Sequence, residues 1–111
     1  MTTDHPRLTA DDLGAELGPR ATLVQISSTF CAPCRATRRV LERVVVTDDG
    51  VAHVELDVAD RPDLGERFAV TTTPTVLVLD RDGVVVRRAS GAPTLVQARA
   101  AVARAAGVSG G

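Results

Sequence analysis

Two cysteines, Cys31 and Cys34, are the residues whose type and spacing could do redox chemistry, and the sequence has no other cysteine. They follow an apolar stretch typical of a strand and precede a stretch with helical periodicity. A thiol at a helix start meets unpaired backbone N–H groups and the positive end of the helix dipole, which favour the reactive thiolate. Residues three apart at such a position lie close enough for a disulfide. The pair is therefore predicted to be a dithiol–disulfide redox centre.

The two cysteines are expected to play different parts. Cys31 should face the unpaired N–H groups and stay accessible, so its thiolate is the predicted nucleophile. Cys34, one turn deeper, should attack the mixed disulfide formed on Cys31 and release the reduced substrate. Inert packing in the core and half of a zinc site are the alternatives. A zinc site needs two more ligands, for which His5 and His53 are the histidines available.

The amino-acid composition limits the class of protein to which this chain can belong. The 111 residues are 44% hydrophobic and 24% charged, which is typical of one globular domain over residues 1–111. Residues 1–7 and 108–111 are expected to be flexible. A net charge of −1 gives no reason to expect nucleic acid or an anionic membrane surface as a partner. No apolar run approaches the roughly 18 residues of a transmembrane helix, and the polar N-terminus is unlike a secretory signal. A cytoplasmic monomer is expected.

Hydrophobic periodicity predicts the elements that position the cysteines. Helices are expected at residues 9–17, 32–47, 60–68 and 95–107, and strands at 21–28, 51–57, 75–79 and 84–88. Thr9, Asp60 and Thr94 are the expected helix caps, and Gly107 the expected end of the last helix. A helical crossover should make the first two strands parallel, and an Asp-Gly turn should make the last two an antiparallel hairpin. This order predicts an α/β fold: a four-stranded mixed sheet with helices on both faces.

Two motifs within this order resemble those of the thioredoxin family. Phe30-Cys31-Ala32-Pro33-Cys34-Arg35 is similar to the family's Trp-Cys-Gly-Pro-Cys-Lys, and Thr73-Pro74-Thr75 is similar to its Ile-Pro-Thr. Gly91 matches a family glycine beside the active site. The resemblance covers roughly residues 8 to 107 by order of elements. It implies a thioredoxin fold in which Pro74 is cis and lies against the cysteine pair.

The resemblance also implies which residues surround the cysteines. These are Phe30, Ala32, Pro33, Arg35, Thr73, Pro74 and Gly91. Pro33 starts the helix and in the family also tunes the redox potential. Arg35 is either an ordinary exposed helix residue or a cation that favours the Cys31 thiolate. The backbone of Thr73 is expected to pair with an extended segment of substrate.

Three positions depart from the family pattern. Phe30 replaces the tryptophan before the first cysteine, Gln25 stands six residues before Cys31 where thioredoxins usually carry a buried aspartate, and His53 stands where they usually carry a lysine. Gln25 cannot ionise, so it is expected to lie beneath the sulfurs as a neutral hydrogen-bonding group. His53 is expected to be a structural histidine or, alternatively, a proton relay. Both residues are candidates for modulating proton transfer.

The sequence thus predicts a thiol–disulfide oxidoreductase of thioredoxin type that reduces protein disulfides. No bound cofactor or metal is expected, because the two sulfurs carry the two electrons themselves. A separate reductase or a low-molecular-weight thiol would recycle the disulfide. The alternatives are a non-catalytic binding or redox-sensing module and a dedicated reductant of one partner, such as a peroxiredoxin. Turnover of a generic disulfide such as that of insulin separates the first hypothesis from the other two.

Overall fold

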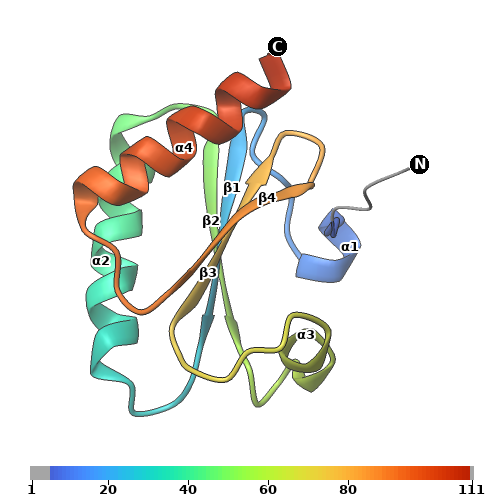
Figure 1. Cartoon of the computed structure of the whole chain (residues 1–111), viewed down its shortest axis with the longest axis vertical. Coiled ribbons are helices and arrows are strands. Elements are labelled where there is room, and N and C mark those ends of the chain that lie inside the picture. Colours follow the sequence, from blue (N-terminus) through green and yellow to red (C-terminus); the bar gives the residue numbers. More distant parts are fainter. Residues whose placement is uncertain (1–5, 111) are drawn as a thin grey trace.

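Eight helices and strands follow one another in the predicted order in the computed structural model, which describes residues 6–110 and, of these, the side chains up to residue 107 (Figure 1). They are α1 (Ala10–Leu13), β1 (Ala21–Ser27), α2 (Ala32–Thr47), β2 (Val51–Asp57), α3 (Pro62–Arg67), β3 (Thr75–Asp80), β4 (Val85–Ser90) and α4 (Leu95–Gly110). Residues 1–5 and 111, within the ends expected to be flexible, lie outside the described residues. No helix between residues 6 and 110 is long and apolar enough to cross a membrane.

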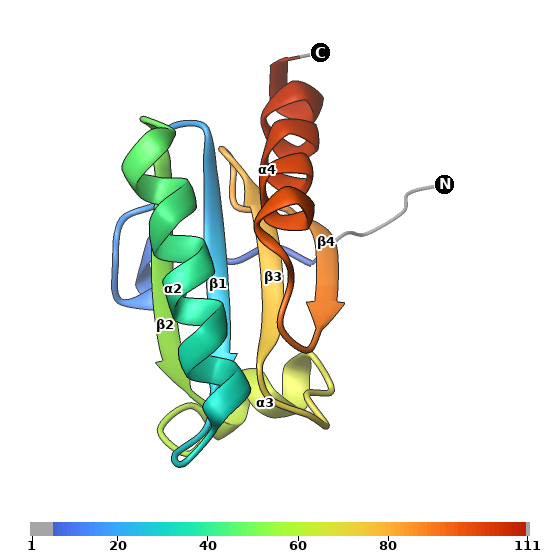
Figure 2. The same ribbon diagram turned by 90° about the vertical axis from the view of Figure 1, so that its left-hand side faces the viewer.

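The sheet is the predicted four-stranded mixed sheet, with strand order β2-β1-β3-β4. β1 and β2 are parallel, whereas β1–β3 and β3–β4 are antiparallel. α2 and α4 cover one face of the sheet, and α1 and α3 lie on the other (Figures 1 and 2). Because β1 and β2 are parallel, their C-terminal ends lie at the same end of the sheet. α2 begins shortly after the end of β1.

The first helix is shorter than predicted. The predicted capping box is present, since the Thr9 side chain accepts from the Asp12 N–H and the Asp12 carboxylate accepts from the Thr9 N–H. The helix nevertheless ends at Leu13, because Gly14 adopts a left-handed φ of 68° and donates its N–H to the Ala10 carbonyl. Glycine takes this conformation without a Cβ clash, so a glycine inside the apolar pattern ended the helix early.

Two other helix ends differ from the prediction. α3 begins at Pro62 and its N-cap is Arg61 rather than Asp60, with no side-chain hydrogen bond at the cap. α4 begins as predicted, with a capping box between Thr94 and Gln97. It continues beyond Gly107 to Gly110. A glycine inside a helix costs only about 1 kcal/mol relative to alanine, so Gly107 alone does not end it.

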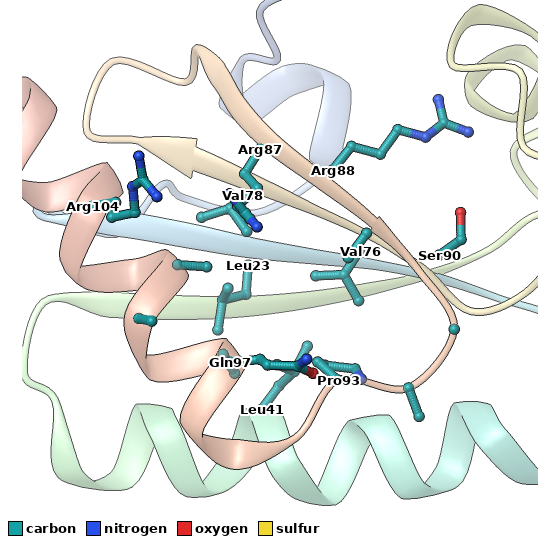
Figure 3. A pocket seen from close by; sticks show the side chains of 16 residues that line it. Leu23, Leu41, Val76, Val78, Arg87, Arg88, Ser90, Pro93, Gln97 and Arg104 are labelled. Atoms are coloured by element: carbon teal, nitrogen blue, oxygen red, sulfur yellow. The ribbon is translucent and has the colours of Figure 1, made fainter.

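The central strand β1 fixes the position of the site, because all seven of its residues are buried. Alternate side chains of β1 point to opposite faces. Leu23 packs with residues of α2 and α4 such as Leu41, whereas Val24 and Ile26 belong to the core that contains α3 residues such as Leu64. Figure 3 shows Leu23 between α4 and the side of α2 that carries Leu41. A strand buried on both faces cannot shift its register, so the residues that follow it are held firmly.

The segment before α1 is joined to the β3–β4 hairpin by backbone hydrogen bonds. The Leu8 N–H donates to the Gly83 carbonyl over 2.9 Å, and Arg7 forms an isolated antiparallel bridge with Val84. Leu8 is fully buried. A Cβ on Gly83, which has a φ of +86°, would lie 2.2 Å from the Leu8 carbonyl oxygen. Only glycine therefore fits between the hairpin and this segment.

Replacing Gly83 by alanine should reduce the free energy of unfolding by at least about 2 kcal/mol, from the left-handed φ and the clash together. Gly14→Ala is the matched control, because Gly14 also has a positive φ but nothing within 4 Å of the added Cβ. It should lose about 1 kcal/mol. Urea unfolding followed by circular dichroism measures both. Equal losses in the two variants would show that the Leu8 contact is not tight.

Candidate active site

The two cysteines lie where β1 gives way to α2, as predicted. Phe30 has a φ of 57° and a 97% exposed side chain, and it marks the turn between the two elements. Cys31 is the N-cap of α2, and its Sγ accepts the backbone N–H of Cys34 over 3.1 Å. The two residues are joined by a disulfide, with their Cα atoms 5.2 Å apart. The helix start thus directs one of its unpaired N–H groups at the first sulfur.

The two sulfurs differ in accessibility. Cys34 is only 1% exposed, whereas Cys31 is partly exposed. Ala32 and Pro33 form the first exposed turn of α2, and Arg35 follows them on its surface. An incoming molecule can therefore reach Cys31, while Cys34 lies against the protein interior.

A second loop brings Thr73 and Pro74 to the cysteines. The peptide bond between them is cis. Cys31 Sγ lies 3.7 Å from the Thr73 carbonyl oxygen and 3.8 Å from its hydroxyl oxygen. The Gly91 N–H donates to the Pro74 carbonyl over 2.9 Å. The structure thus brings Thr73 to the exposed sulfur and holds Gly91 against the loop that carries Pro74.

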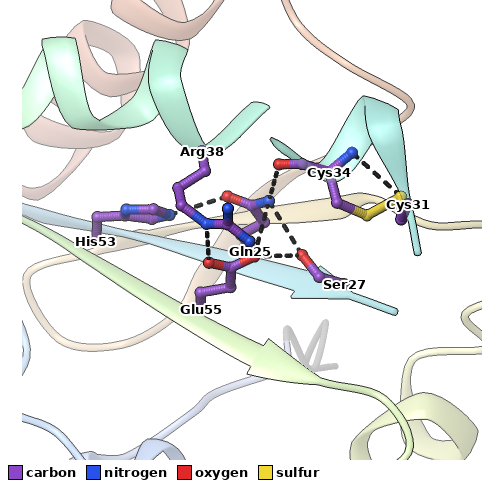
Figure 4. Close-up of polar contacts among 7 residues, drawn as sticks. All are labelled: Gln25, Ser27, Cys31, Cys34, Arg38, His53 and Glu55. Atoms are coloured by element: carbon purple, nitrogen blue, oxygen red, sulfur yellow. Dashed lines mark hydrogen bonds and ion pairs between the residues drawn. A yellow bond between two sulfur atoms is a disulfide. The ribbon is translucent and has the colours of Figure 1, made fainter. Parts of the chain in front are cut away.

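Gln25 lies beneath Cys34, as expected. It is fully buried on β1, and its Nε2 donates to the Cys34 carbonyl over 2.8 Å (Figure 4). The same nitrogen lies 3.0 Å from Ser27 Oγ and 3.3 Å from Glu55 Oε2. The amide Oε1 lies 3.0 Å from His53 Nε2. Each end of the amide therefore has partners, and Gln25 links the first turn of α2 to β2 without carrying charge.

Sequence reasoning missed Glu55. The register pairs Gln25 with Glu55 across β1 and β2, whereas His53 pairs with Leu23. His53 still reaches the Gln25 amide, but the carboxylate of Glu55 is the group nearest to the Gln25 Nε2 on that strand. The alternation of side chains along β2 could have revealed Glu55, because residues 53, 55 and 57 lie on the same face of the strand.

Arg38 and Ser27 hold the Glu55 carboxylate from both sides. Arg38 donates from Nε to Oε1 over 2.6 Å and from Nη2 to Oε2 over 2.8 Å, and the Ser27 hydroxyl donates to Oε2 over 2.8 Å. The hydrogen bond from Arg38 is the main reason that the pKa of Glu55 lies below its usual value. Burial lowers the pKa of His53, against the opposing charge of Glu55. At neutral pH the site therefore contains an ionised Glu55 and a neutral His53.

The structure also bears on the zinc alternative. Across residues 6–110, no group of three or more His, Cys, Asp or Glu side chains is arranged to hold a metal ion. His5 lies outside the described residues. His53 is turned toward the Gln25 amide, which occupies its Nε2.

Acid should weaken the contribution of Glu55 to stability. Because its pKa is lowered by folding, the stabilisation is present above the usual carboxyl value of about 4.3 and is lost as pH falls through the lower folded pKa. The stability advantage of the wild type over Glu55→Gln should shrink by about 1 kcal/mol between neutral pH and about pH 3, since Arg38 is partly exposed. Urea unfolding at a series of pH values measures this. Parallel curves for the two proteins would contradict it.

A second acid beside Glu55 should be poorly tolerated. Gln25→Glu has nearly the same shape but removes the donor to the Cys34 carbonyl and buries a charge near Glu55, so it should lose about 3 kcal/mol of stability at neutral pH. The swapped variant Gln25→Glu/Glu55→Gln restores one charge and one amide, and it should recover part of this loss. Thermal and urea unfolding of both variants test the point. Equal losses would mean that charge repulsion is unimportant here.

Comparisons with known proteins agree with this geometry. The family model for thioredoxin matches residues 8–104. Thioredoxin from Staphylococcus epidermidis is 30% identical over 86 residues, covering 77% of this chain and 82% of that protein. Thioredoxin from Mycobacterium tuberculosis is 40% identical over 73 residues, covering 63% of this chain and 60% of that protein.

A solved structure shows the same fold. A mutant thioredoxin from Halobacterium salinarum superposes with a TM-score of 0.74 at 20% identity, covering 86% of this chain and 81% of that chain. The similarity at this identity concerns the fold, while the family model extends over most of the chain and includes both cysteines. With its Cys31–Cys34 disulfide at the start of α2, the chain belongs to the thioredoxin family of thiol–disulfide oxidoreductases.

Proposed function

We propose that Cys31 is the catalytic nucleophile, that Cys34 is the resolving cysteine, and that the substrates are protein disulfides. The observation that carries the proposal is the difference between the two sulfurs. Cys31 is accessible and accepts the Cys34 N–H, which stabilises negative charge on its sulfur, whereas Cys34 is buried.

The proposed reaction moves two electrons in two exchanges. The Cys31 thiolate attacks one sulfur of the substrate disulfide, forming a mixed disulfide and releasing the other substrate sulfur as a thiolate. The Cys34 thiolate then attacks Cys31 Sγ. The second substrate sulfur leaves as a thiolate and takes up a proton, and the Cys31–Cys34 disulfide remains. The substrate is reduced and the protein oxidised by the same two electrons, so no bound cofactor or metal is required.

An extended substrate segment would dock beside Cys31. The Thr73 carbonyl oxygen lies 3.7 Å from Cys31 Sγ. The exposed Phe30 directly precedes Cys31 in the sequence. A backbone carbonyl at this place can accept from an N–H of a substrate strand, which gives affinity without sequence preference. Pro74 and Gly91 support this loop through their backbone hydrogen bond.

Gln25 and His53 have different proposed parts. Gln25 holds the Cys34 carbonyl and is a positioning residue. His53 contacts the Gln25 amide, so its link to Cys34 runs through a group that cannot ionise. This favours the structural role of His53 over the proton relay.

The protein must be re-reduced after each turnover. Thioredoxins act on protein disulfides and are recycled by reductases, and a reductase or a low-molecular-weight thiol is the proposed source of electrons for this chain.

The cytoplasmic location and the monomeric state stay predictions. The non-catalytic alternative keeps one specific observation in its favour, since the neutral Gln25 cannot serve as a base during resolution.

Insulin reduction with dithiothreitol as the electron source tests the proposed activity. Wild-type protein should accelerate precipitation of the insulin B chain, and Cys31→Ser should abolish the acceleration. Cys34→Ser should form stable mixed disulfides with insulin, detectable by mass spectrometry, whereas Cys31→Ser should form none. Failure of the wild type to turn over insulin would favour the binding module or the dedicated reductant.

The order of the two cysteines has its own measurement. In reduced protein at neutral pH, iodoacetamide should alkylate Cys31 at least about ten-fold faster than Cys34, because the helix start favours its thiolate and burial shields Cys34. Peptide mapping after timed quenching gives both rates. Comparable rates would contradict the assignment of the nucleophile.

A further inference from the structure

A polar hollow of about 520 Å³ lies against the disulfide. Its walls come from the end of β1, the first turn of α2, and the end of β2 with the residues that follow, and they include Ser27, Cys31 and Cys34. Thr73 and Pro74 do not line it. The polar hollow therefore reaches the sulfurs on a side that the loop proposed to bind substrate backbone does not line, although its wall residue Ser28 is hydrogen-bonded to Thr73. Ser27, Cys31, Cys34, Arg38 and Glu55, which line the polar hollow, are among the residues drawn in Figure 4.

The polar hollow has charges of both signs that the protein itself leaves available. Arg38 and Glu55 on its wall pair with each other. Arg35, from α2, and Asp60, after β2, have exposed side chains without an ion pair or side-chain hydrogen bond to the rest of residues 6–110. Asp57 accepts hydrogen bonds from the Ala59 N–H and the Thr29 hydroxyl, but it has no cationic partner among those residues. One guanidinium and two carboxylates on the wall thus have no ion-pair partner within residues 6–110.

These features define the molecule that would fit. A volume of this size is in the range of small-molecule sites, which run from about 300 to 1,000 Å³. A free cation on one element and free anions on another complement a molecule that carries both a carboxylate and an ammonium group. Because the hollow reaches the reactive sulfurs, the molecule must also carry sulfur if it is to take part in the reaction.

We infer that the polar hollow binds a low-molecular-weight zwitterionic thiol, of amino-acid or small-peptide type, as its mixed disulfide with Cys31. Arg35 contacts its carboxylate, and Asp57 and Asp60 contact its ammonium group. The inference rests on the proposed role of Cys31 as nucleophile. It assigns to a small thiol the recycling of the disulfide and leaves the Thr73 side for protein substrates.

The recycling reaction balances as two exchanges. A small thiolate attacks Cys31 Sγ, forms the mixed disulfide and releases the Cys34 thiolate, which takes up a proton. A second small thiolate then attacks the sulfur of the bound small molecule. Cys31 leaves as a thiolate, and a symmetrical small disulfide is released. Two thiols are oxidised by two electrons, and one protein disulfide is reduced.

The test follows the second exchange in reverse, in the full chain with Cys34→Ser, where Cys31 is the single thiol. The probes are four small disulfides: cystine, which is zwitterionic; cystamine, which carries amines; dithiodipropionate, which carries carboxylates; and hydroxyethyl disulfide, which is neutral. Mass spectrometry gives the rate of mixed-disulfide formation with each. Every rate is divided by that for the neutral probe, which cancels changes in the reactivity of Cys31 itself.

Arg35→Gln should lower the relative rates for cystine and dithiodipropionate by about two- to five-fold, as expected for an ion pair with an exposed side chain. Asp57→Asn/Asp60→Asn should lower those for cystine and cystamine by a similar factor of about two to five. Cystine has no net charge at neutral pH, so the overall charge of the protein should not change its relative rate. A lower relative rate for cystine in both variants would therefore require contacts with both its carboxylate and its ammonium group. The matched controls are Arg43→Gln in α2 and Asp49→Asn just after α2, two exposed positions that do not line the hollow. They should change no relative rate.

Two results would overturn the inference. In the first, the relative rate for cystine is unchanged in both Arg35→Gln and Asp57→Asn/Asp60→Asn, which would show that the hollow does not recognise a zwitterion. In the second, the relative rate for cystine falls in only one of these variants, which would show that only one charge of the ligand is recognised. Either result leaves the proposed function standing if the wild type still turns over insulin. Absence of a mixed disulfide with all four probes would instead contradict the role of Cys31 as nucleophile.

Discussion

The hydrogen bond from the Cys34 N–H to Cys31 Sγ is the interaction on which the rest of the site depends. It exists because α2 begins directly after Cys31, so that an otherwise unpaired donor of the first turn points at the sulfur. The burial of β1 on both faces fixes the point from which the chain enters that turn. Packing far from the sulfurs thereby helps to determine which of the two sulfurs accepts a backbone N–H of the helix start.

Gln25 shows how the protein supports this turn without a charge beneath it. An amide supplies donors for the Cys34 carbonyl and an acceptor for His53, which a carboxylate in the same place could not do together. The negative charge lies instead on Glu55, one strand away, where Arg38 and Ser27 compensate it. Burying a neutral group under the cysteines avoids the desolvation penalty of a buried acid. The ionised carboxylate thus lies on β2, and the group that contacts the Cys34 carbonyl is neutral.

Much of this arrangement could be predicted from the sequence, because local signals carry it. The spacing of Cys31 and Cys34, the capping boxes and the periodicities located the elements and the redox pair. Glu55 was missed because its importance depends on the register between β1 and β2, which pairs residues distant in the sequence. The early end of α1 and the extension of α4 reflect glycines whose effect depends on context, since Gly14 takes a left-handed φ and Gly107 lies within the helix. The polar hollow requires three segments to be placed together, which no single motif encodes.

The surroundings of Cys31 differ on its two sides, and this has a chemical consequence. On one side the Thr73 carbonyl offers a backbone acceptor, which suits any extended chain and confers little selectivity. On the other side charged side chains from α2 and β2 line a hollow of small-molecule size, which suits a compact ligand with defined charges. Both sides lead to the same sulfur, because Cys34 is buried. In the proposed mechanism one nucleophile, Cys31, exchanges with partners of different size that occupy it in turn, which is the order that a cycle of reduction and recycling requires.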